Sequence, residues 1–308
     1  MDKFIGIDVS KARLDVHVEP GGTAFAVSRD AEGLSELVEK LAQQPCACIA
    51  VEATGGYERV VAAELAAAGL PVAVVNPAQV RAFAQAIGER AKTDPIDAAV
   101  IARFAAAVRP EIRPLRDADT ARLADLVARR RQIVAMITAE TQRLSRASAR
   151  SARSIKRLIT ALQRELSDVD GDIDAAVRES PLWRAREALL TSVPGVGRVV
   201  ARTLVAELPE LGRLTRRQIA ALAGLAPWTR QSGQWRGRSF IGGGRASVRS
   251  ALYMAALTAA RCKGPLKDFV DAMVARGKAK KLALIALARK ILVTLNAIVR
   301  DQKPYHPA

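Results

Sequence analysis

The chain has 308 residues, a net charge of +17 and an apolar content of 50%. This length allows two domains, each with its own core. The two histidines and three cysteines (Cys46, Cys48 and Cys262) are too few and too scattered for a zinc site, and predict reduced thiols. Acidic residues interrupt the first apolar stretch and Arg or Gly breaks the later ones, so we expect a soluble, cytoplasmic protein with no membrane partner.

The positive charge is unevenly distributed. Residues 1–180 carry 25 Lys/Arg against 25 Asp/Glu, whereas residues 181–308 carry 23 against 6. Residues 211–267 include eleven basic residues and no acidic one. A solvated charged surface normally mixes both signs, so this pattern predicts a nucleic-acid-binding C-terminal domain.

Short strands and helices alternate in the first part of the chain. Turn residues and apolar periodicity predict strands Phe4–Val9, Leu14–Val18 and Thr23–Val27, helix Ala31–Gln43, strand Cys46–Glu52, helix Tyr57–Ala68, strand Pro71–Asn76 and a last helix from Asp94. Three antiparallel strands followed by alternating helix and strand indicate an RNase H-like α/β domain over residues 1–116.

Four carboxylates stand out in this domain. Asp8 and Glu52 each end an apolar strand, and Asp94 and Asp97 lie one helical turn apart. Such acids repel each other unless a divalent cation binds among them, and an all-oxygen site suits Mg²⁺ or Mn²⁺. These ions organise in-line attack at phosphorus, so the pattern predicts a metal-dependent phosphodiester enzyme. Alternatively, Asp94 is an N-cap before Pro95 and Asp97 favours the helix dipole, but strand-terminal carboxylates are costly without a partner.

Residues 117–180 are typical of two long amphipathic helices. Apolar residues recur at spacings of three and four, with no Gly or Pro between Asp117 and Asp170. We interpret this segment as a coiled-coil linker interrupted at Arg143–Arg153 and contacting a partner subunit. The alternative is a helical hairpin that packs on its own domain.

Residues 181–308 are expected to form a mainly helical, basic domain that begins at Pro181. Residues 189–204 resemble a helix-hairpin-helix, in which Gly195 and Gly197 allow a tight turn that presents backbone N–H groups to a DNA phosphate. A glycine-rich connection without a ligand is the alternative.

A loop rich in arginine and tryptophan separates the predicted helices Gln218–Ala226 and Ser247–Arg261. Its cations and aromatic rings suit backbone neutralisation and base stacking. The candidate nucleic-acid-binding residues here are Arg230, Trp235, Arg236, Arg238, Arg245 and Arg249. Ser232 precedes a glycine, but the residues alone favour an ordinary turn serine, with Ser239 and Ser247 equal as candidate nucleophiles.

The chain resembles the DEDD transposases of the IS110 insertion-sequence family. The resemblance rests on IGIDVSK (5–11), VEATG (51–55), VNP (75–77), KTDPIDA (92–98), VPGVG (193–197), LAGLAP (222–227) and RSALYM (249–254). It implies a RuvC-like domain, a coiled-coil linker and a C-terminal transposase domain. It also implies that Asp8, Glu52, Asp94 and Asp97 bind the metal and that Ser232 is the catalytic nucleophile.

The resemblance further implies an RNA-guided recombinase that cuts and joins donor and target DNA through a phosphoserine intermediate. Its partners would be the two DNAs and a structured bridge RNA, and it would act as a homo-oligomer, a dimer or a tetramer, at the prokaryotic nucleoid. Two alternatives stay open: a RuvC-like junction endonuclease that activates water, and a non-catalytic nucleic-acid-binding protein on a decayed transposase scaffold.

Overall fold

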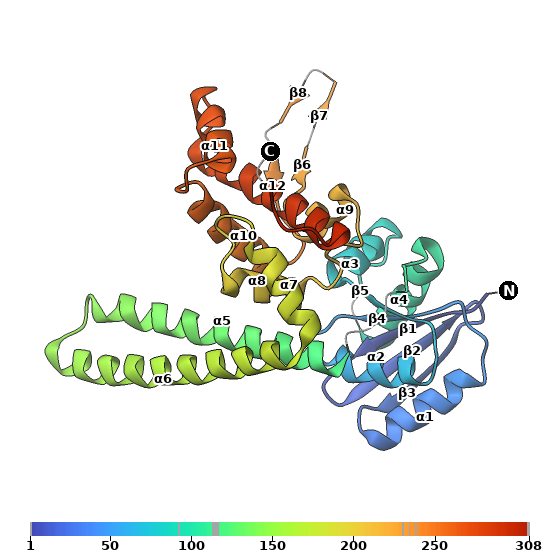
Figure 1. Ribbon diagram of the computed structural model, residues 1–308. Coiled ribbons are helices and arrows are strands. Elements are labelled where there is room, and N and C mark those ends of the chain that lie inside the picture. Colours follow the sequence, from blue (N-terminus) through green and yellow to red (C-terminus); the bar gives the residue numbers. More distant parts are fainter. Residues whose placement is uncertain are drawn as a thin grey trace. The chain divides into compact units, whose positions relative to one another are not determined.

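The computed structural model describes residues 2–91, 93–112, 117–229, 231–233, 235–237 and 239–306. The chain divides into two compact units, Met1–Leu115 and Arg116–Ala308 (Figure 1). The segments 117–180 and 181–308 therefore belong to one unit.

A five-stranded mixed sheet forms the centre of the N-terminal unit, in the order β3-β2-β1-β4-β5. The strands are β1 Phe4–Val9, β2 Arg13–Glu19, β3 Thr23–Ser28, β4 Cys48–Glu52 and β5 Val72–Val75. The first three are antiparallel, as predicted, and β4 and β5 continue the sheet in parallel to β1.

Strand alternation divides this unit into two cores. The odd-numbered residues of β1 pack with α1 (Ala31–Ala42) and α2 (Glu58–Ala67). Phe4, on the other face, packs with α3 (Pro77–Ala86) and α4 (Asp94–Val108). Residues 77–86 were not predicted as a helix, although Asn76 caps α3 by accepting from the Ala78 N–H at 2.8 Å and Pro77 opens its first turn.

Gly6 allows α4 to lie directly on β1. A Cβ atom at Gly6 would stand 2.3 Å from both the Ala102 nitrogen and the Ala98 carbonyl oxygen, which are backbone atoms of α4. Residues 6 and 8 share one face of the strand, because side chains alternate. The same close approach therefore carries the first turn of α4 toward Asp8.

Replacing Gly6 by alanine is expected to destabilise the protein by at least about 2 kcal/mol, because backbone atoms must move to admit the methyl group. Gly171→Ala is the matched control: it lies inside a helix with open space at its Cβ and should stabilise by about 0.5–1 kcal/mol. Urea unfolding of both variants measures the difference. Equal stability of Gly6→Ala and the parent would contradict the close approach.

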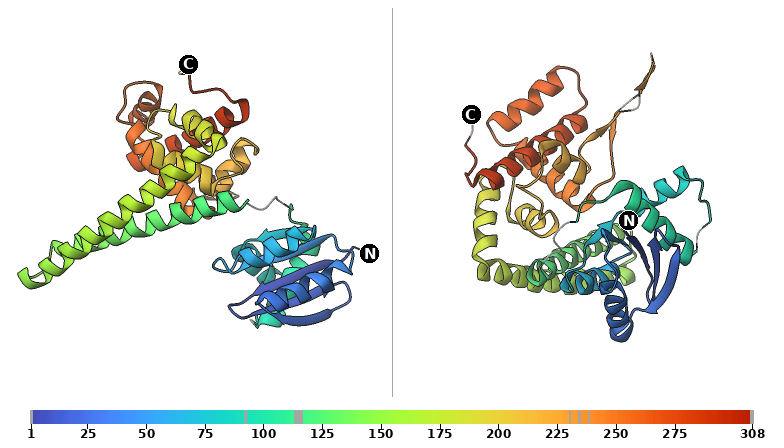
Figure 2. Two further views of the ribbon diagram at one scale, coloured as in Figure 1. Left: turned by 60° about the horizontal axis from the view of Figure 1, so that its bottom comes forward. Right: turned by 90° about the vertical axis from the view of Figure 1, so that its right-hand side faces the viewer.

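Two long helices, α5 (Ala118–Leu144) and α6 (Ala149–Glu179), form a hairpin in the C-terminal unit and lie side by side in Figure 2. Arg130 Nε donates to Asp170 Oδ1 across them at 2.6 Å. The break is shorter than predicted, because Ser148 already caps α6 by accepting from the Ser151 N–H. The far half of the hairpin, which is the half next to the connection between α5 and α6, exposes apolar side chains, including Leu158, which is 47% exposed.

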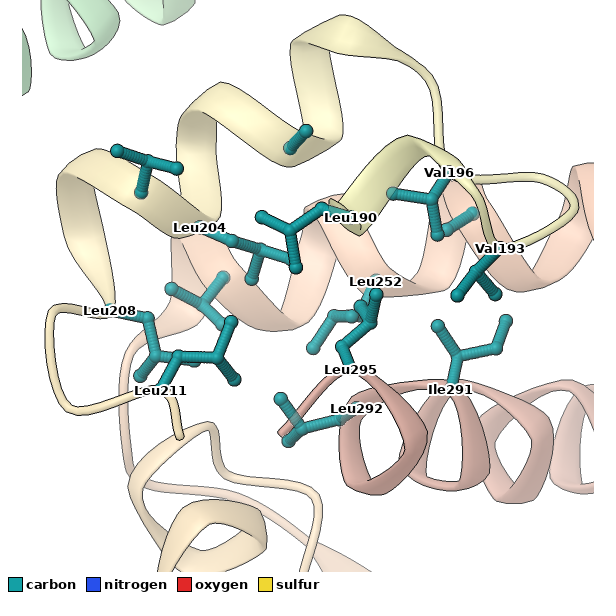
Figure 3. Packing of buried hydrophobic residues seen from close by; sticks show 14 of the residues in the cluster. Leu190, Val193, Val196, Leu204, Leu208, Leu211, Leu252, Ile291, Leu292 and Leu295 are labelled. Atoms are coloured by element: carbon teal, nitrogen blue, oxygen red, sulfur yellow. The ribbon is translucent and has the colours of Figure 1, made fainter. Parts of the chain in front are cut away.

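The remaining helices are α7 (Pro181–Thr191), α8 (Arg198–Glu207), α9 (Arg216–Leu222), α10 (Ala246–Ala259), α11 (Pro265–Ala275) and α12 (Lys280–Asp301). Leucines and isoleucines of α7, α8, α10 and α12 meet in one core (Figure 3). Among the described helices, only α12 is long and apolar enough to cross a membrane by length and composition. It is mostly buried within this core, as the central helix of a soluble domain would be.

Four two-residue strands project from the helices as a hairpin arm (Figure 1). β6 (Pro227–Trp228) pairs with β9 (Phe240–Ile241) at its base, and β7 (Gln231–Ser232) pairs with β8 (Trp235–Arg236) farther out. The predicted helix Gln218–Ala226 was too long, because Gly224 adopts a left-handed conformation (φ 68°) and ends α9 early.

Candidate active site and nucleic-acid interface

The sheet places Asp8 and Glu52 at the same end of two neighbouring strands, β1 and β4. β1 and β4 run in parallel with Ile7 opposite Val51, so Asp8 and Glu52 are the next residues in register. Both follow buried strand residues and are themselves half-buried. Neighbouring side chains in register project from the same face of a sheet, which here is the face that α4 covers.

The first turn of α4 adds Asp94 and Asp97. Thr93, not Asp94, holds the N-cap position, and Pro95 lies in the first turn. The Asp97 N–H donates to the Thr93 carbonyl at 2.8 Å. Asp94 is exposed and Asp97 half-buried, and both lie in the first turn, where the helix dipole favours negative charge, so only the N-cap part of the alternative is wrong.

The charges of these acids act on one another. The pKa of Asp8 is raised from 3.8 to about 6, mainly by burial and then by the nearby carboxylates of Asp97 and Asp94, whereas a hydrogen bond from the Val9 backbone lowers it. Asp8 therefore faces an excess of negative charge, which a divalent cation would neutralise.

The residues fit such a cation by their chemistry, since all are hard oxygen donors. Within the described part of the chain, however, no three carboxylate, histidine or cysteine side chains are close enough together to hold one ion. Carboxylates without a cation repel each other, so ligation requires side-chain rotation that draws them in.

The raised pKa of Asp8 predicts that the metal-free protein becomes less stable as the pH rises. The folded state holds this proton more tightly than the unfolded chain, so the stabilisation is full below about pH 4 and is lost as the pH passes 6. The loss is at most about 3 kcal/mol, because solvent screens the half-buried group. Asp8→Asn should flatten this decline and raise the melting temperature at pH 7.5 in EDTA. An unchanged pH profile for Asp8→Asn would contradict the crowding of the carboxylates.

A fifth carboxylate, which was not predicted, lies beside Asp8. Asp15 on β2 is directly opposite Asp8 in the antiparallel register and is only 4% exposed. Arg13 donates to both of its carboxylate oxygens, from Nε at 3.1 and 3.0 Å and from Nη2 at 2.8 Å. The signal in the sequence was an acid on β2 at the position that comes opposite Asp8 when β1 and β2 pair as a hairpin.

Ser232 lies on β7 and is exposed, and Gly233 after it turns the chain with a φ of 55°. The two competing serines have hydrogen bonds: Ser239 Oγ lies 3.2 Å from Thr229 Oγ1, and Ser247 Oγ donates to Glu207. The Ser232 hydroxyl has no hydrogen-bond partner among the described residues, although the strand itself pairs with β8. Its hydroxyl is thus presented at the surface of the arm.

The helix-hairpin-helix glycines differ in what they contact. Gly195 has a φ of 88°, and a Cβ there would approach the Ala255 carbonyl oxygen to 2.5 Å, so packing on α10 requires this glycine. Gly197 is the N-cap of α8 without a side-chain cap and has open space around it. Arg184 and Arg198, which were not predicted, line the shallow groove at this turn.

Two of the arginines predicted to bind nucleic acid, Arg245 and Arg249, make hydrogen bonds inside the C-terminal unit. Arg245 donates to both carboxylate oxygens of Glu210 at 2.5 and 2.6 Å, and Arg249 donates to the Gly243 carbonyl at 2.5 Å. They hold the base of the arm. Arg230 and Arg238 lie outside the described residues, as do the side chains of Trp235 and Arg236.

An exposed aromatic pair marks the base of the arm. Trp228 is 56% exposed and its ring lies 6.1 Å from that of Phe240, centroid to centroid. Trp228 is one of the two tryptophans of the loop that was predicted to stack on bases, whereas Phe240 was not predicted as a contact. Exposed rings of this kind suit stacking against nucleic-acid bases.

Comparison with known proteins places these features in a family. Residues 5–147, which contain all four carboxylates, match the DEDD transposases of IS110. Residues 187–271, which contain Gly195, Gly197 and Ser232, match the transposase IS116/IS110/IS902 family.

Individual relatives agree with these matches. The chain is 27% identical to the pilin gene-inverting protein of Moraxella bovis over 98% of this chain and 97% of that protein. It is 29% identical to the protein of the same name in Moraxella lacunata, over 83% of this chain and 80% of the relative. A 43.6 kDa protein of insertion element IS110 from Streptomyces coelicolor is 31% identical over 48% of this chain and 36% of its own length.

Proposed function

Because this chain belongs to the IS110 family of insertion-sequence transposases and is a DNA recombinase, we propose that it cuts and rejoins DNA through a covalent phosphoserine at Ser232. The carboxylates of Asp8, Glu52, Asp94 and Asp97 assist this reaction. The observation that carries the proposal is that Asp8 and Glu52 lie at the same end of two paired parallel strands and that the charges of Asp94 and Asp97 act on Asp8, in a chain whose two halves both match transposases.

The N-terminal unit is proposed to be RuvC-like. Its strand order, with an antiparallel meander followed by two parallel strands, and the acids on the first strand, the fourth strand and the last helix support this assignment. The family implies dependence on a divalent metal, and we propose Mg²⁺ or Mn²⁺. When bound, the ion supplies Lewis-acid stabilisation of charge at the phosphate.

The four carboxylates reach the proposed metal site from two kinds of element. Asp8 and Glu52 hold their carboxylates on rigid strands, and Asp94 and Asp97 close the site from α4. Because Asp8 loses its proton near pH 6 in the metal-free protein, neutral pH favours the ionised form that can act as a ligand.

Ser232 is proposed to attack the scissile phosphorus through Oγ. A new Oγ–P bond forms as the bond from phosphorus to a deoxyribose oxygen breaks; the serine hydroxyl loses its proton and the leaving oxygen gains one. Rejoining reverses these steps with a new strand end. The phosphodiester energy is conserved throughout, whereas hydrolysis would release it.

Ser232 and the carboxylates belong to different compact units, so catalysis requires residues of both units at one phosphate. We propose that the acids of one subunit act with the serine of another in a dimer or tetramer. Exposed apolar residues such as Leu158 on the far half of the α5–α6 hairpin offer a surface for subunit contact.

Nucleic acid is proposed to bind the C-terminal unit through phosphate contacts. The open N-terminus of α8 at Gly197, the acid-free stretch 211–267 and the exposed arm support this. Sequence choice would fall to a structured bridge RNA that pairs with donor and target DNA, following the resemblance to RNA-guided members of the family. The relatives named as pilin gene-inverting proteins suggest that inversion of a DNA segment is one outcome.

RNA guidance predicts that the purified protein retains RNA and that recombination depends on it. Treatment with RNase should abolish recombination on a plasmid with both sites, and adding back the extracted RNA should restore it. Binding to that RNA should weaken steeply with salt, because each phosphate contact releases counterions. Recombination at a defined site by RNase-treated protein would contradict RNA guidance and leave the serine chemistry untouched.

A RuvC-like junction endonuclease that uses activated water is the alternative. The separation of Ser232 from the carboxylates into two units favours it, because water needs only the acidic unit. In that case Ser232→Ala would cleave DNA as fast as the parent protein. A non-catalytic protein on a decayed scaffold would cleave under no condition.

A further inference from the structure

We propose that Arg13, held in place by the buried Asp15, binds a non-bridging oxygen of the DNA phosphate that is cut. This inference rests on the proposed function and adds a substrate-binding residue to its site. Arg13 and Asp15 both lie on β2 and do not belong to the proposed set of four metal-binding carboxylates. Their side chains project from the face of the sheet that carries Asp8.

The backbone of Arg13 is fixed by the β1–β2 turn. Its N–H donates to Ser10 Oγ at 3.1 Å, and its carbonyl oxygen accepts from the Ser10 N–H at 2.9 Å and from Ser10 Oγ at 2.8 Å. Ser10 stands two residues after Asp8. The backbone of Arg13 is thus tied to the strand end that presents Asp8.

The guanidinium is fixed by Asp15. Nε and Nη2 of Arg13 donate to the Asp15 carboxylate, which is nearly inaccessible to solvent, whereas the Arg13 side chain is 58% exposed. Among the described residues Nη1 has no hydrogen-bond acceptor. An arginine with one edge bound to a buried acid and the other facing solvent is already oriented for a phosphate oxygen.

The position of Arg13 also matches the acid cluster. Asp15 is the strand partner of Asp8, and the charge of Asp94 acts on the Arg13 guanidinium. A phosphate drawn to a cation among Asp8, Glu52, Asp94 and Asp97 would meet Arg13 at the β2 side. There the guanidinium would stabilise the negative charge that grows on the phosphate oxygens during attack.

The competing explanation is that Arg13 only neutralises Asp15, and a double variant separates the two roles. Arg13→Gln alone leaves a buried charge unpaired, but Arg13→Gln/Asp15→Asn removes both charges with little change of shape. If Arg13 binds phosphate, the double variant stays about a hundredfold slower than the parent in single-turnover strand cleavage, and Asp15→Asn alone loses about tenfold. Recovery of the double variant to within a few-fold of the parent would overturn the proposal.

A measurement without metal provides an independent readout. The affinity of the full-length protein for a duplex DNA carrying the cut site is measured in EDTA over a range of salt. Compared with Asp15→Asn, the double variant should show a slope of log K against log salt that is smaller in magnitude by about 0.9, for one lost phosphate contact. Lys40→Gln, which breaks the exposed pair with Glu36 on α1, should leave the slope unchanged.

These readouts keep the inference separable from the proposed function. If the parent protein fails to cleave with any divalent cation, the proposed reaction is wrong, yet the salt slope still decides whether Arg13 touches a phosphate. If the parent cleaves normally and the slopes of Asp15→Asn and the double variant agree, Arg13 is a structural residue and the inference is wrong.

Discussion

Replacing Ser232 by alanine is expected to lower recombination by at least about a thousandfold while DNA and RNA binding stay within about twofold of the parent. The hydroxyl is exposed on the arm and has no hydrogen-bond partner among the described residues, so its loss should not destabilise the fold. The change removes only the nucleophile. A quantitative recombination assay and a filter-binding assay on the same preparations measure the two effects.

Ser239→Ala and Ser247→Ala are the matched controls. Ser239 lies beside Thr229 and Ser247 donates to Glu207, so each variant loses an internal hydrogen bond worth about 1 kcal/mol. Both should recombine within about tenfold of the parent. A complete loss in either control, with normal activity in Ser232→Ala, would assign the nucleophile to that other serine.

Asp8→Asn and Glu52→Gln are each expected to lower strand cleavage by at least about a hundredfold. Either change keeps the shape of the side chain but replaces a charged oxygen donor at the sheet edge where β1 and β4 end. Glu36→Gln, on an exposed face of α1, is the control and should cleave like the parent. Cleavage of a labelled duplex with Mg²⁺ or Mn²⁺, and in EDTA, provides the comparison.

Two outcomes would separate the explanations for such a loss. If Asp8→Asn loses cleavage yet melts at a higher temperature than the parent in EDTA, the acid is functional and its charge is costly to the fold. Undiminished cleavage by the parent in EDTA would remove the role of the metal altogether.

The sheet and its acids could be predicted because local patterns determine them. Apolar alternation and turn residues located β1, β2 and β3, and the carboxylates that end β1 and β4 stood out against apolar runs. The parallel pairing of β1 with β4 then follows from the chain order: two antiparallel turns make β3 run in the direction of β1, and the crossover through α1 returns β4 in that same direction.

Other features depend on contacts that a single sequence does not reveal. Asp15 is recognisable as part of the site only once β2 is placed opposite β1 in register, with Arg13 two residues away on the same face. The role of Gly6 likewise depends on how closely α4 approaches.

The contacts of the arm and of its base could not be predicted from the sequence for the same reason. The loop was expected to hold nucleic-acid-binding arginines, but Arg245 and Arg249 make internal contacts that anchor it. Whether an arginine faces solvent or a neighbouring carboxylate such as Glu210 is a property of tertiary packing. The exposed pair of Trp228 and Phe240 arises from strand pairing across twelve residues, which no local pattern encodes.

Mapping the residue that becomes joined to DNA tests the central proposal most directly. The protein, with its RNA and Mg²⁺, is incubated with a nicked substrate that traps the intermediate, and the products are separated by denaturing electrophoresis and digested for mass spectrometry. The proposal predicts a protease-sensitive, shifted DNA band whose nucleotide is attached to the peptide containing Ser232, and no such band for Ser232→Ala. Efficient cleavage that yields free DNA ends and no protein-linked species would contradict it.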